Sequence, residues 1–369
     1  MQLLFLADRL STRGGADLHL LEVMASALRA GADVTVGVGR VDDDARVPDG
    51  VVVERVRGLG SAVATGSGLG ALAALADVSD VVHLQNVMNP EAIARAVVPG
   101  RTLATVQDHR ILCPGPGRTL PDGRRCEHPM GPRRCAECLD DATYRSRMLE
   151  LTAARAYALR GARLVVLSRY MASELADLGR RCDVVPPWVT PGPARSQAGD
   201  TVLLAGRLVA HKQPEAAVAA WRAAGRPLPL RIAGDGPADV RADDIVTLGW
   251  IDHERLVTEL RRARMLLFPA RWQEPFGITG VEALAQATPV VVSDVGGTRD
   301  WSVCGCLRIA PGDVEAMSAA IRTLVDDPAR ALELGRRGQR EVARRFARDA
   351  LEPRLWRLWE RAAAGRADP

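Results

Sequence analysis

Lysine and asparagine are almost absent from this chain. Of 49 lysine and arginine residues, only Lys212 is a lysine, and Asn86 and Asn89 are the only two asparagines. This bias is typical of a high-GC genome, which uses the codons for these residues rarely. Arginine cannot replace lysine where a compact ammonium group is needed. A residue that persists against such a bias suggests a chemical requirement, so all three positions become candidate site residues.

The sequence also lacks a long apolar run and a strong net charge. No apolar stretch approaches the ~20 residues of a transmembrane helix, and the apolar start Met1–Ala7 ends at Asp8, too soon for a signal-peptide core. We therefore expect no transmembrane segment and a cytoplasmic location. A net charge of +4 over 369 residues argues against nucleic acid as a partner. The length and a hydrophobic content of 47% suit two domains; the oligomeric state is not predicted.

The amino-terminal half alternates strands and helices. We expect a strand at Leu3–Ala7, a helix at Asp17–Ala30 and a strand at Val34–Val38. The connecting loop lacks G-x-G-x-x-G, so a dinucleotide site is not indicated. Its paired glycines, Gly14 and Gly15, would let backbone N–H groups approach an anion. A plain strand-to-helix turn is the alternative.

Polar residues cluster at the ends of two further predicted strands, Val81–Leu84 and Thr102–Val106. Polar side chains at the carboxyl ends of parallel strands face the crevice in which ligands bind. The residues in question are His83, Gln85, Asn86 and Asn89 for the first strand, and Gln107, Asp108 and His109 for the second.

Four of the seven cysteines fall in one loop rich in glycine, proline and arginine. Disulfides are disfavoured in a cytosolic chain, whereas four thiolates ending in C-x2-C fit a structural zinc site, in which His128 could replace one ligand. The loop has little hydrophobic material of its own, and a metal could supply its order. An iron–sulfur cluster and free thiols are the alternatives. The predicted ligands are Cys113, Cys126, Cys135 and Cys138.

The carboxyl-terminal half begins after a proline-rich linker and contains the most informative stretch. A strand at Leu266–Phe268, a helix at Ile278–Ala287 and a strand at Pro289–Ser293 form a βαβ unit. Glu274 precedes this helix and Glu282 lies in its second turn, with seven residues between them. Glu282 could bind a vicinal diol, as acidic residues bind ribose in nucleotide folds.

The segment from Glu274 to Glu282 reads E-P-F-G-x4-E. It resembles the E-x7-E signature of retaining glycosyltransferases of the GT-B fold, in the large group called family four. Gly206-Arg207-Leu208 followed by Lys212 is similar to the family's G-R-L-x3-K, and Gly234-Asp235-Gly236-Pro237 to its A-G-x-G-P turn. The resemblance covers nearly the whole chain and is strongest from Gly206 to Asp300.

The resemblance implies an α/β fold of two Rossmann-like domains that face each other across a cleft (GT-B). The first domain, residues 1–186, would carry the acceptor side and the cysteine-rich loop 113–138. The second, residues 197–350, would bind the nucleotide sugar. A terminal helix at 351–369 would cross back to the first domain.

The resemblance also implies an enzyme, a retaining hexosyl- or N-acetylhexosaminyl-transferase that moves a sugar from a nucleotide sugar to an acceptor hydroxyl. UDP-GlcNAc or UDP-glucose is our first expectation for the donor, with GDP-mannose or a dTDP-sugar open. The acceptor would be a small molecule or a saccharide, as in bacterial aminoglycoside-type or cell-surface glycan biosynthesis. No metal or other cofactor is expected for the chemistry.

Site roles carried over from the family fall into three groups. Arg207 and Lys212 would hold the donor diphosphate, whose charge grows as it leaves, and Glu282 the ribose. Relatives often have H-D where this chain has Gln107-Asp108, so it is open whether Asp108 or His109 assists catalysis beside Glu274. The acceptor side would include His83, Gln85, Asn86 and Asn89. The donor-binding set comprises Gly14, Gly15, Arg207, Lys212, Gly234, Trp250, Ile251, Phe276, Gly277 and Glu282.

Two other functions are compatible with these features. A nucleotide-sugar epimerase on the same fold would consume the donor without an acceptor. A non-catalytic protein could bind a sugar nucleotide, or nucleic acid through the arginines of the cysteine loop. The modest net charge and the lack of interleaved aromatic residues argue against nucleic acid.

Overall fold

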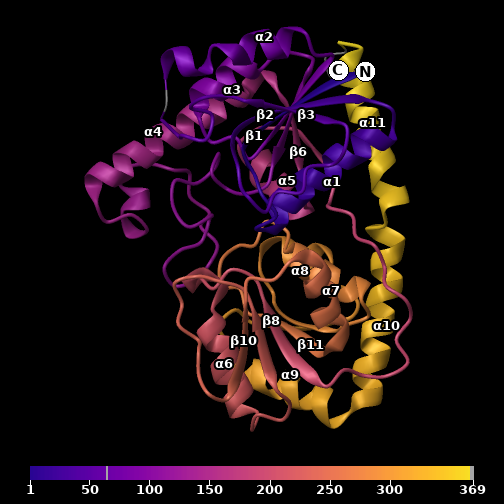
Figure 1. The fold of residues 1–369 in the computed structure, drawn as a ribbon. Coiled ribbons are helices and arrows are strands. Elements are labelled where there is room, and N and C mark those ends of the chain that lie inside the picture. Colours follow the sequence, from indigo (N-terminus) through magenta and orange to yellow (C-terminus); the bar gives the residue numbers. More distant parts are fainter. Residues whose placement is uncertain (64, 366–369) are drawn as a thin grey trace. The chain divides into compact units, whose positions relative to one another are not determined.

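A computed structural model describes residues 1–63 and 65–365 and divides the chain into two compact units (Figure 1). Unit 1 comprises Met1–Pro121, Cys126–Pro186 and the chain from Leu351 onward. Unit 2 comprises Pro187–Ala350 together with Asp122–Arg125 from the cysteine loop. The sequence analysis assigned the whole cysteine loop to the first domain. The structure instead groups Asp122–Arg125 of this loop with unit 2.

Unit 1 is built on a seven-stranded parallel sheet with the order β3-β2-β1-β4-β5-β6-β7. Its central strands are buried along their whole length, as expected for a parallel sheet covered on both faces. The strands are β1 (Gln2–Leu10), β2 (Asp33–Val41), β3 (Val51–Arg55), β4 (Val81–Gln85), β5 (Thr102–Val106), β6 (Arg163–Val166) and β7 (Cys182–Val184).

The helices of unit 1 come from both ends of the chain. Helix α11 (Arg348–Ala363) follows unit 2 in sequence, yet from Leu351 onward it belongs to unit 1. Its Trp359 is fully buried and donates a hydrogen bond from Nε1 to Nδ1 of His83 in β4, 3.1 Å away. The others are α1 (Gly15–Arg29), α2 (Ala71–Asp77), α3 (Pro90–Ala96), α4 (Ala142–Ala158) and α5 (Arg169–Ala176).

Unit 2 contains a six-stranded parallel sheet with the order β10-β9-β8-β11-β12-β13. The strands are β8 (Thr201–Ala205), β9 (Leu230–Ala233), β10 (Ile245–Gly249), β11 (Ala263–Phe268), β12 (Val290–Ser293) and β13 (Cys306–Ile309). The helices are α6 (Pro214–Ala223), α7 (His253–Arg262), α8 (Ile278–Ala285), α9 (Val314–Asp326) and α10 (Pro328–Arg345).

Two parallel sheets with intervening helices confirm the predicted α/β class with two Rossmann-like halves. Each sheet has its own apolar core, which includes Leu4, Leu84 and Ala104 in unit 1 and Val202, Ile232 and Leu267 in unit 2. Within the described chain, no helix has the length and apolar character needed to cross a membrane.

Candidate functional site

In unit 2, the loops that follow β8 and β9 touch backbone to backbone. Leu208 N donates to Asp235 O at 2.8 Å, and a Cβ on Gly234 would lie 1.9 Å from Gly206 O. Only glycine fits at position 234, where φ is +150°. This contact fixes the backbone on either side of Arg207, whose side chain is exposed and has no hydrogen-bond or ion-pair partner among the described residues.

Lys212 and Glu274 form an ion pair, although 62 residues separate them. The Nε1 of Trp272 donates to the same carboxylate oxygen at 2.8 Å. The Lys212 ammonium also lies 5.3 Å from the centroid of the Phe268 ring and 5.4 Å from that of Trp272, within cation–π range. The structure thus brings together two residues to which the sequence analysis gave separate roles, diphosphate binding for Lys212 and catalysis for Glu274.

The loop that carries Glu274 is held by close glycine packing. Gly297 N donates to Glu274 O at 2.6 Å, and a Cβ on Gly296 would lie 2.4 Å from that same oxygen. Trp301 Nε1 donates to Phe276 O at 2.6 Å. Gly277 then enters α8 with φ +88°, and no side chain caps the helix. The first N–H groups of α8 are therefore available to an anion or a hydroxyl.

Glu282 lies in α8 and accepts a hydrogen bond from His253 at 2.8 Å. His253 is the first residue of α7 and directly follows the loop that contains Trp250 and Ile251, both half-buried. Gly234 N donates to Gly249 O at 2.8 Å, which links that loop to the turn after β9. The sequence analysis missed His253. His253 could have been suspected from the sequence, because it lies three residues after Trp250, in the segment already predicted to bind the donor.

His211 is a second residue of unit 2 that the sequence analysis left without a role. Burial, and then the charges of Lys212 and Arg207, lower the pKa of His211 to about 4. Its ring centroid is 4.5 Å from that of Trp272, and its buried Nε2 has no hydrogen-bond partner among the described residues. At neutral pH His211 is therefore uncharged beside two permanent cations.

In unit 1, Gly14 and Gly15 lie where β1 gives way to α1. Gly14 has φ +137° and precedes the first helical residue, Gly15. No side chain caps α1. The geometry permits the predicted anion contact of the backbone but does not test it.

Three predicted site residues of unit 1 are buried and make hydrogen bonds within the unit. His83 lies inside β4 with no exposed surface; its Nε2 contacts Thr105 Oγ1 at 2.8 Å and its Nδ1 accepts from Trp359. Asn89 is 1% exposed and caps α3 by accepting from Glu91 N and Ala92 N, while its amide donates to Ser61 O. His109 is 2% exposed and contacts Tyr170 Oη at 2.9 Å. These side chains are buried and hydrogen-bonded within unit 1, so their predicted roles at the acceptor side and in catalysis stay predictions.

Gln85 and Gln107 form a small buried polar network. Gln107 Nε2 donates to Gln85 Oε1 at 3.2 Å and lies 3.1 Å from Nδ1 of His19, whose pKa burial lowers to about 4. The Nε2 of Gln85 has no partner among the described residues. Asn86 follows with φ +58°, a left-handed conformation that asparagine tolerates better than most residues.

Asp108 belongs to a charged cluster that includes Asp8, which the sequence analysis did not assign to the site. Burial raises the pKa of Asp108, but the ion pair and hydrogen bonds with Arg110 outweigh it and lower the pKa below its usual range. Asp8 in β1 accepts from Met88 N at 3.2 Å, and burial raises its pKa from 3.8 to about 6. Arg155 donates to Met88 O at 2.7 Å. Asp8 could have been suspected as a site residue from the sequence, because it is a charged residue that interrupts an apolar strand.

The four predicted zinc ligands carry free thiols and are half-buried. Neighbouring thiols contribute to the raised pKa of Cys113 and Cys138, after burial as the larger cause. In residues 1–63 and 65–365, no group of three or more His, Cys, Asp or Glu side chains is already spaced to hold a metal ion. Zinc binding therefore stays a prediction.

Comparison with known proteins finds a family that resembles part of unit 2. Residues 199–327 match the family of glycosyl transferases group 1. Unit 2 contains this matched segment and is therefore similar to a group 1 domain. The predicted motifs at Arg207, Lys212, Glu274 and Glu282 all lie in the matched segment.

Curated relatives match part of the chain. Mycobacterium tuberculosis glycogen synthase is 34% identical over 170 residues, which cover 41% of this chain and 40% of the relative. The 2-deoxystreptamine glucosyltransferase of Streptomyces kanamyceticus is 30% identical over 207 residues, 48% of this chain and 53% of the relative. The chain therefore spans about half the length of these relatives or less.

Solved structures match nearly the whole chain and show its fold. The Anabaena protein HepE, in a complex with UDP and glucose, superposes with a TM-score of 0.70 at 18% identity, over 98% of this chain and 99% of HepE. Sucrose-phosphate synthase from Thermosynechococcus elongatus gives 0.68 at 18% identity, over 99% and 100%. Units 1 and 2 together have the GT-B fold.

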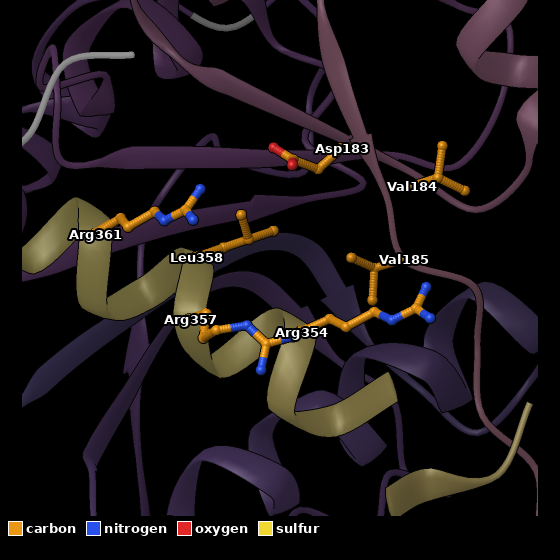
Figure 2. A pocket seen from close by; sticks show the side chains of 7 residues that line it. All are labelled: Asp183, Val184, Val185, Arg354, Arg357, Leu358 and Arg361. Atoms are coloured by element: carbon orange, nitrogen blue, oxygen red, sulfur yellow. The ribbon is translucent and has the colours of Figure 1, made fainter. Parts of the chain in front are cut away.

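A groove in unit 1 is separate from every predicted site residue. It has a volume of about 210 Å³ and lies between α11 and the chain at β7 (Figure 2). Arginine side chains from α11 line one side of it. The lining residues are Asp183, Val184, Val185, Arg354, Arg357, Leu358 and Arg361.

Proposed function

We propose that this chain is a retaining glycosyltransferase that moves a sugar from a nucleotide-sugar donor to an acceptor hydroxyl. The observation that carries the proposal is the grouping of Arg207, Lys212 and Glu274 in unit 2. Arg207 has no hydrogen-bond or ion-pair partner in the described part of the chain, and Lys212 is held by a carboxylate. Both cations act on His211, and two such cations suit a diphosphate ligand. Glu282 and His253 lie in the same domain and suit a ribose diol.

In the proposed reaction, cations stabilise the leaving diphosphate and a carboxylate binds the sugar. As the bond from the sugar C1 to the phosphate oxygen breaks, negative charge grows on the nucleoside diphosphate, and Arg207 and Lys212 stabilise it. His211, neutral at pH 7, adds no competing charge. A diphosphate that binds Lys212 would weaken its pairing with Glu274, whose carboxylate could then accept hydrogen bonds from sugar hydroxyls.

Retention requires the acceptor oxygen to attack C1 on the face that the phosphate leaves. The transition state is oxocarbenium-like, as in glycoside hydrolysis. The departing phosphate oxygen takes the acceptor proton, so no covalent sugar intermediate and no metal are needed for the chemistry. In unit 1, Asp8 and Asp108 are the carboxylates at the strand ends that would bind the acceptor.

UDP is the nucleotide that the comparisons favour. HepE was solved with UDP, glucose and UDP-glucose, and a curated relative is named as a glucosyltransferase. We therefore propose UDP-glucose or UDP-GlcNAc as the donor. A small amino- or hydroxyl-rich molecule or a saccharide is the proposed acceptor, in line with the relatives' names.

Thermal unfolding with a panel of UDP, GDP and dTDP and their sugars tests the donor site. Ligand at a hundred times its dissociation constant should add ~2.7 kcal/mol of stability. Arg207→Ala should weaken binding of the preferred nucleotide by ~10–100-fold, the value of a hydrogen bond to a charged group. This variant removes no hydrogen bond or ion pair within the described residues, so its effect on nucleotide affinity reports on the ligand.

Arg337→Ala is the matched control, because Arg337 is exposed in α10 and also has no partner among the described residues. It should leave the shift unchanged. No stabilisation by any nucleotide, or equal losses in both variants, would contradict the proposal. Consumption of the donor to an epimer without acceptor would favour the epimerase. A product with inverted anomeric configuration would refute retention.

A further inference from the structure

The cysteine loop of unit 1 has almost no apolar core of its own. From Cys113 to Leu139 no hydrophobic side chain is buried, and the regular structure is one short 3-10 turn, Arg134–Glu137. Its main anchor is Arg118, which pairs with Glu174 at 2.7 Å and donates to His128 O at 2.7 Å. A segment of this length that buries no apolar surface needs another source of order to offset its conformational entropy.

The path of the loop brings its four cysteines into one neighbourhood. Cys126 N donates to Arg118 O at 2.7 Å, which places Cys126 beside Arg118, five residues after Cys113. Cys138 Cβ lies 3.5 Å from where a Cβ on Gly115 would be. Cys138 N donates to Cys135 O at 3.2 Å within the C-x2-C turn. All four thiols are close enough for a charge on one to influence another.

Backbone N–H groups point at two of the sulfurs. Gly131 N lies 3.5 Å from Cys135 Sγ, and the N–H groups of Gly115 and Arg118 are directed at the Cys113 sulfur. Backbone donors of this kind support the sulfurs of metal-bound cysteines. The remaining two thiols, of Cys126 and Cys138, contact the carbonyl oxygens of His128 and Thr119 at 3.9 and 3.8 Å.

We propose that one zinc ion binds to four thiolates, those of Cys113, Cys126, Cys135 and Cys138. This ion would cross-link the loop and supply the order that its missing apolar core does not. The sulfurs are near one another but are not yet at metal-site spacing. Binding therefore requires the four side chains to turn toward a common centre and form Zn–S bonds of ~2.3 Å.

The charges of this step balance within the loop. Four thiols release four protons, and the complex of four thiolates with Zn²⁺ carries a formal charge of −2. Arg125, Arg133 and Arg134 of the loop help to offset that charge. Arg118 and Arg124 already pair with Glu174 and Asp122.

Metal analysis of the purified full chain, with a count of reactive thiols, tests the site. We expect close to one equivalent of zinc, and at least a tenfold loss of it in the double variant Cys135→Ser/Cys138→Ser. Cys182→Ser, in β7 of the same unit, is the matched control and should retain the ion. His128→Ala should also retain it if all four ligands are thiolates.

Several results would overturn the proposal. They are less than a tenth of an equivalent of zinc in the parent chain, iron with inorganic sulfide in its place, or zinc that persists in the double variant and is therefore adventitious. Replacement of zinc by cobalt(II) gives a second readout, since four thiolates produce an intense tetrahedral spectrum that the Cys182→Ser variant should share.

A folding defect is separated from metal loss by two further measurements on the chelator-treated parent chain. Proteolysis should accelerate within residues 113–138. Stabilisation by nucleotide should persist, because unit 2 contains none of the four cysteines. Zinc binding and the proposed transferase activity can thus fail independently of each other.

Discussion

At the scale of single residues, two aspartates of unit 1 differ in the sign of their contribution to stability. Burial raises the pKa of Asp8 from 3.8 to about 6. Its contribution to stability is therefore present below pH 3.8 and is lost as the pH rises through 6. At pH 7 the ionised carboxylate destabilises the fold by up to about 3 kcal/mol, taking 1.36 kcal/mol per pKa unit.

We predict that Asp8→Asn raises the free energy of unfolding at pH 7 and flattens its dependence on pH between 4 and 6. Urea unfolding at a series of pH values measures both. Asp108→Asn is the informative comparison, because the pKa of Asp108 is lowered and its ion pair with Arg110 stabilises the ionised form. That variant should be less stable at pH 7. If Asp8→Asn were no more stable than the parent, the carboxylate would not be strained by burial.

Whether the sequence predicted a residue's place depended on how far away its partners lie along the chain. The segments with Lys212 and Glu274 were recognised from local spacing, but their ion pair spans 62 residues and requires β8 and β11 to be neighbours in the sheet. His83 was assigned to a crevice because it is a polar residue near a strand end. Its partner Trp359 lies 276 residues away, beyond the reach of any local pattern.

At the scale of elements, helix α11 depends on the face that it buries against unit 1. Trp359 is fully buried, contacts the Phe5 ring edge-on at 6.0 Å and donates to His83. Trp356, one turn earlier, is only half-buried and donates to Glu360 on the same helix. The two tryptophans thus share a helix and differ in burial.

We predict that Trp359→Ala lowers the free energy of unfolding of unit 1 by ~3–5 kcal/mol, the usual range for a large aromatic residue in a core. Trp356→Ala should cost less, roughly 1–2 kcal/mol, because Trp356 is only half-buried and contacts the core through the edge-on packing of its ring on Trp359 at 5.9 Å. Urea unfolding monitored by circular dichroism provides the comparison. Equal losses in the two variants would mean that α11 is not held by its buried face.

Elements with continuous apolar runs were predicted well, and a weakly buried one was missed. β5 was predicted with its observed bounds, Thr102–Val106, because all five of its residues are buried. β3 (Val51–Arg55) was not predicted; it lies at the edge of the sheet, and four of its residues are exposed. A strand with few buried side chains shows no clear hydrophobic pattern in the sequence. β3 is therefore recognised only from its pairing with β2 in the structure.

At the scale of the whole molecule, two compact units imply two cooperative unfolding events. Tryptophan fluorescence can distinguish the two unfolding transitions, because the seven tryptophans are unequally distributed between the units. Unit 1 contains Trp356 and Trp359, and unit 2 contains Trp188, Trp221, Trp250, Trp272 and Trp301.

We predict that saturating nucleotide moves only the transition of unit 2, since Arg207, Lys212 and Glu282 all belong to it. Ligand at a hundred times its dissociation constant adds ~2.7 kcal/mol, which corresponds to a rise in Tm of roughly 5–10 °C for a unit of this size. Calorimetry with parallel tryptophan fluorescence measures both transitions. Arg207→Ala, which should weaken binding ~10–100-fold, should reduce the shift to about half or less at the same ligand concentration. Trp359→Ala should lower only the transition of unit 1. A single transition that moves as one with nucleotide would contradict independent units and would mean that donor binding stabilises the chain as a whole.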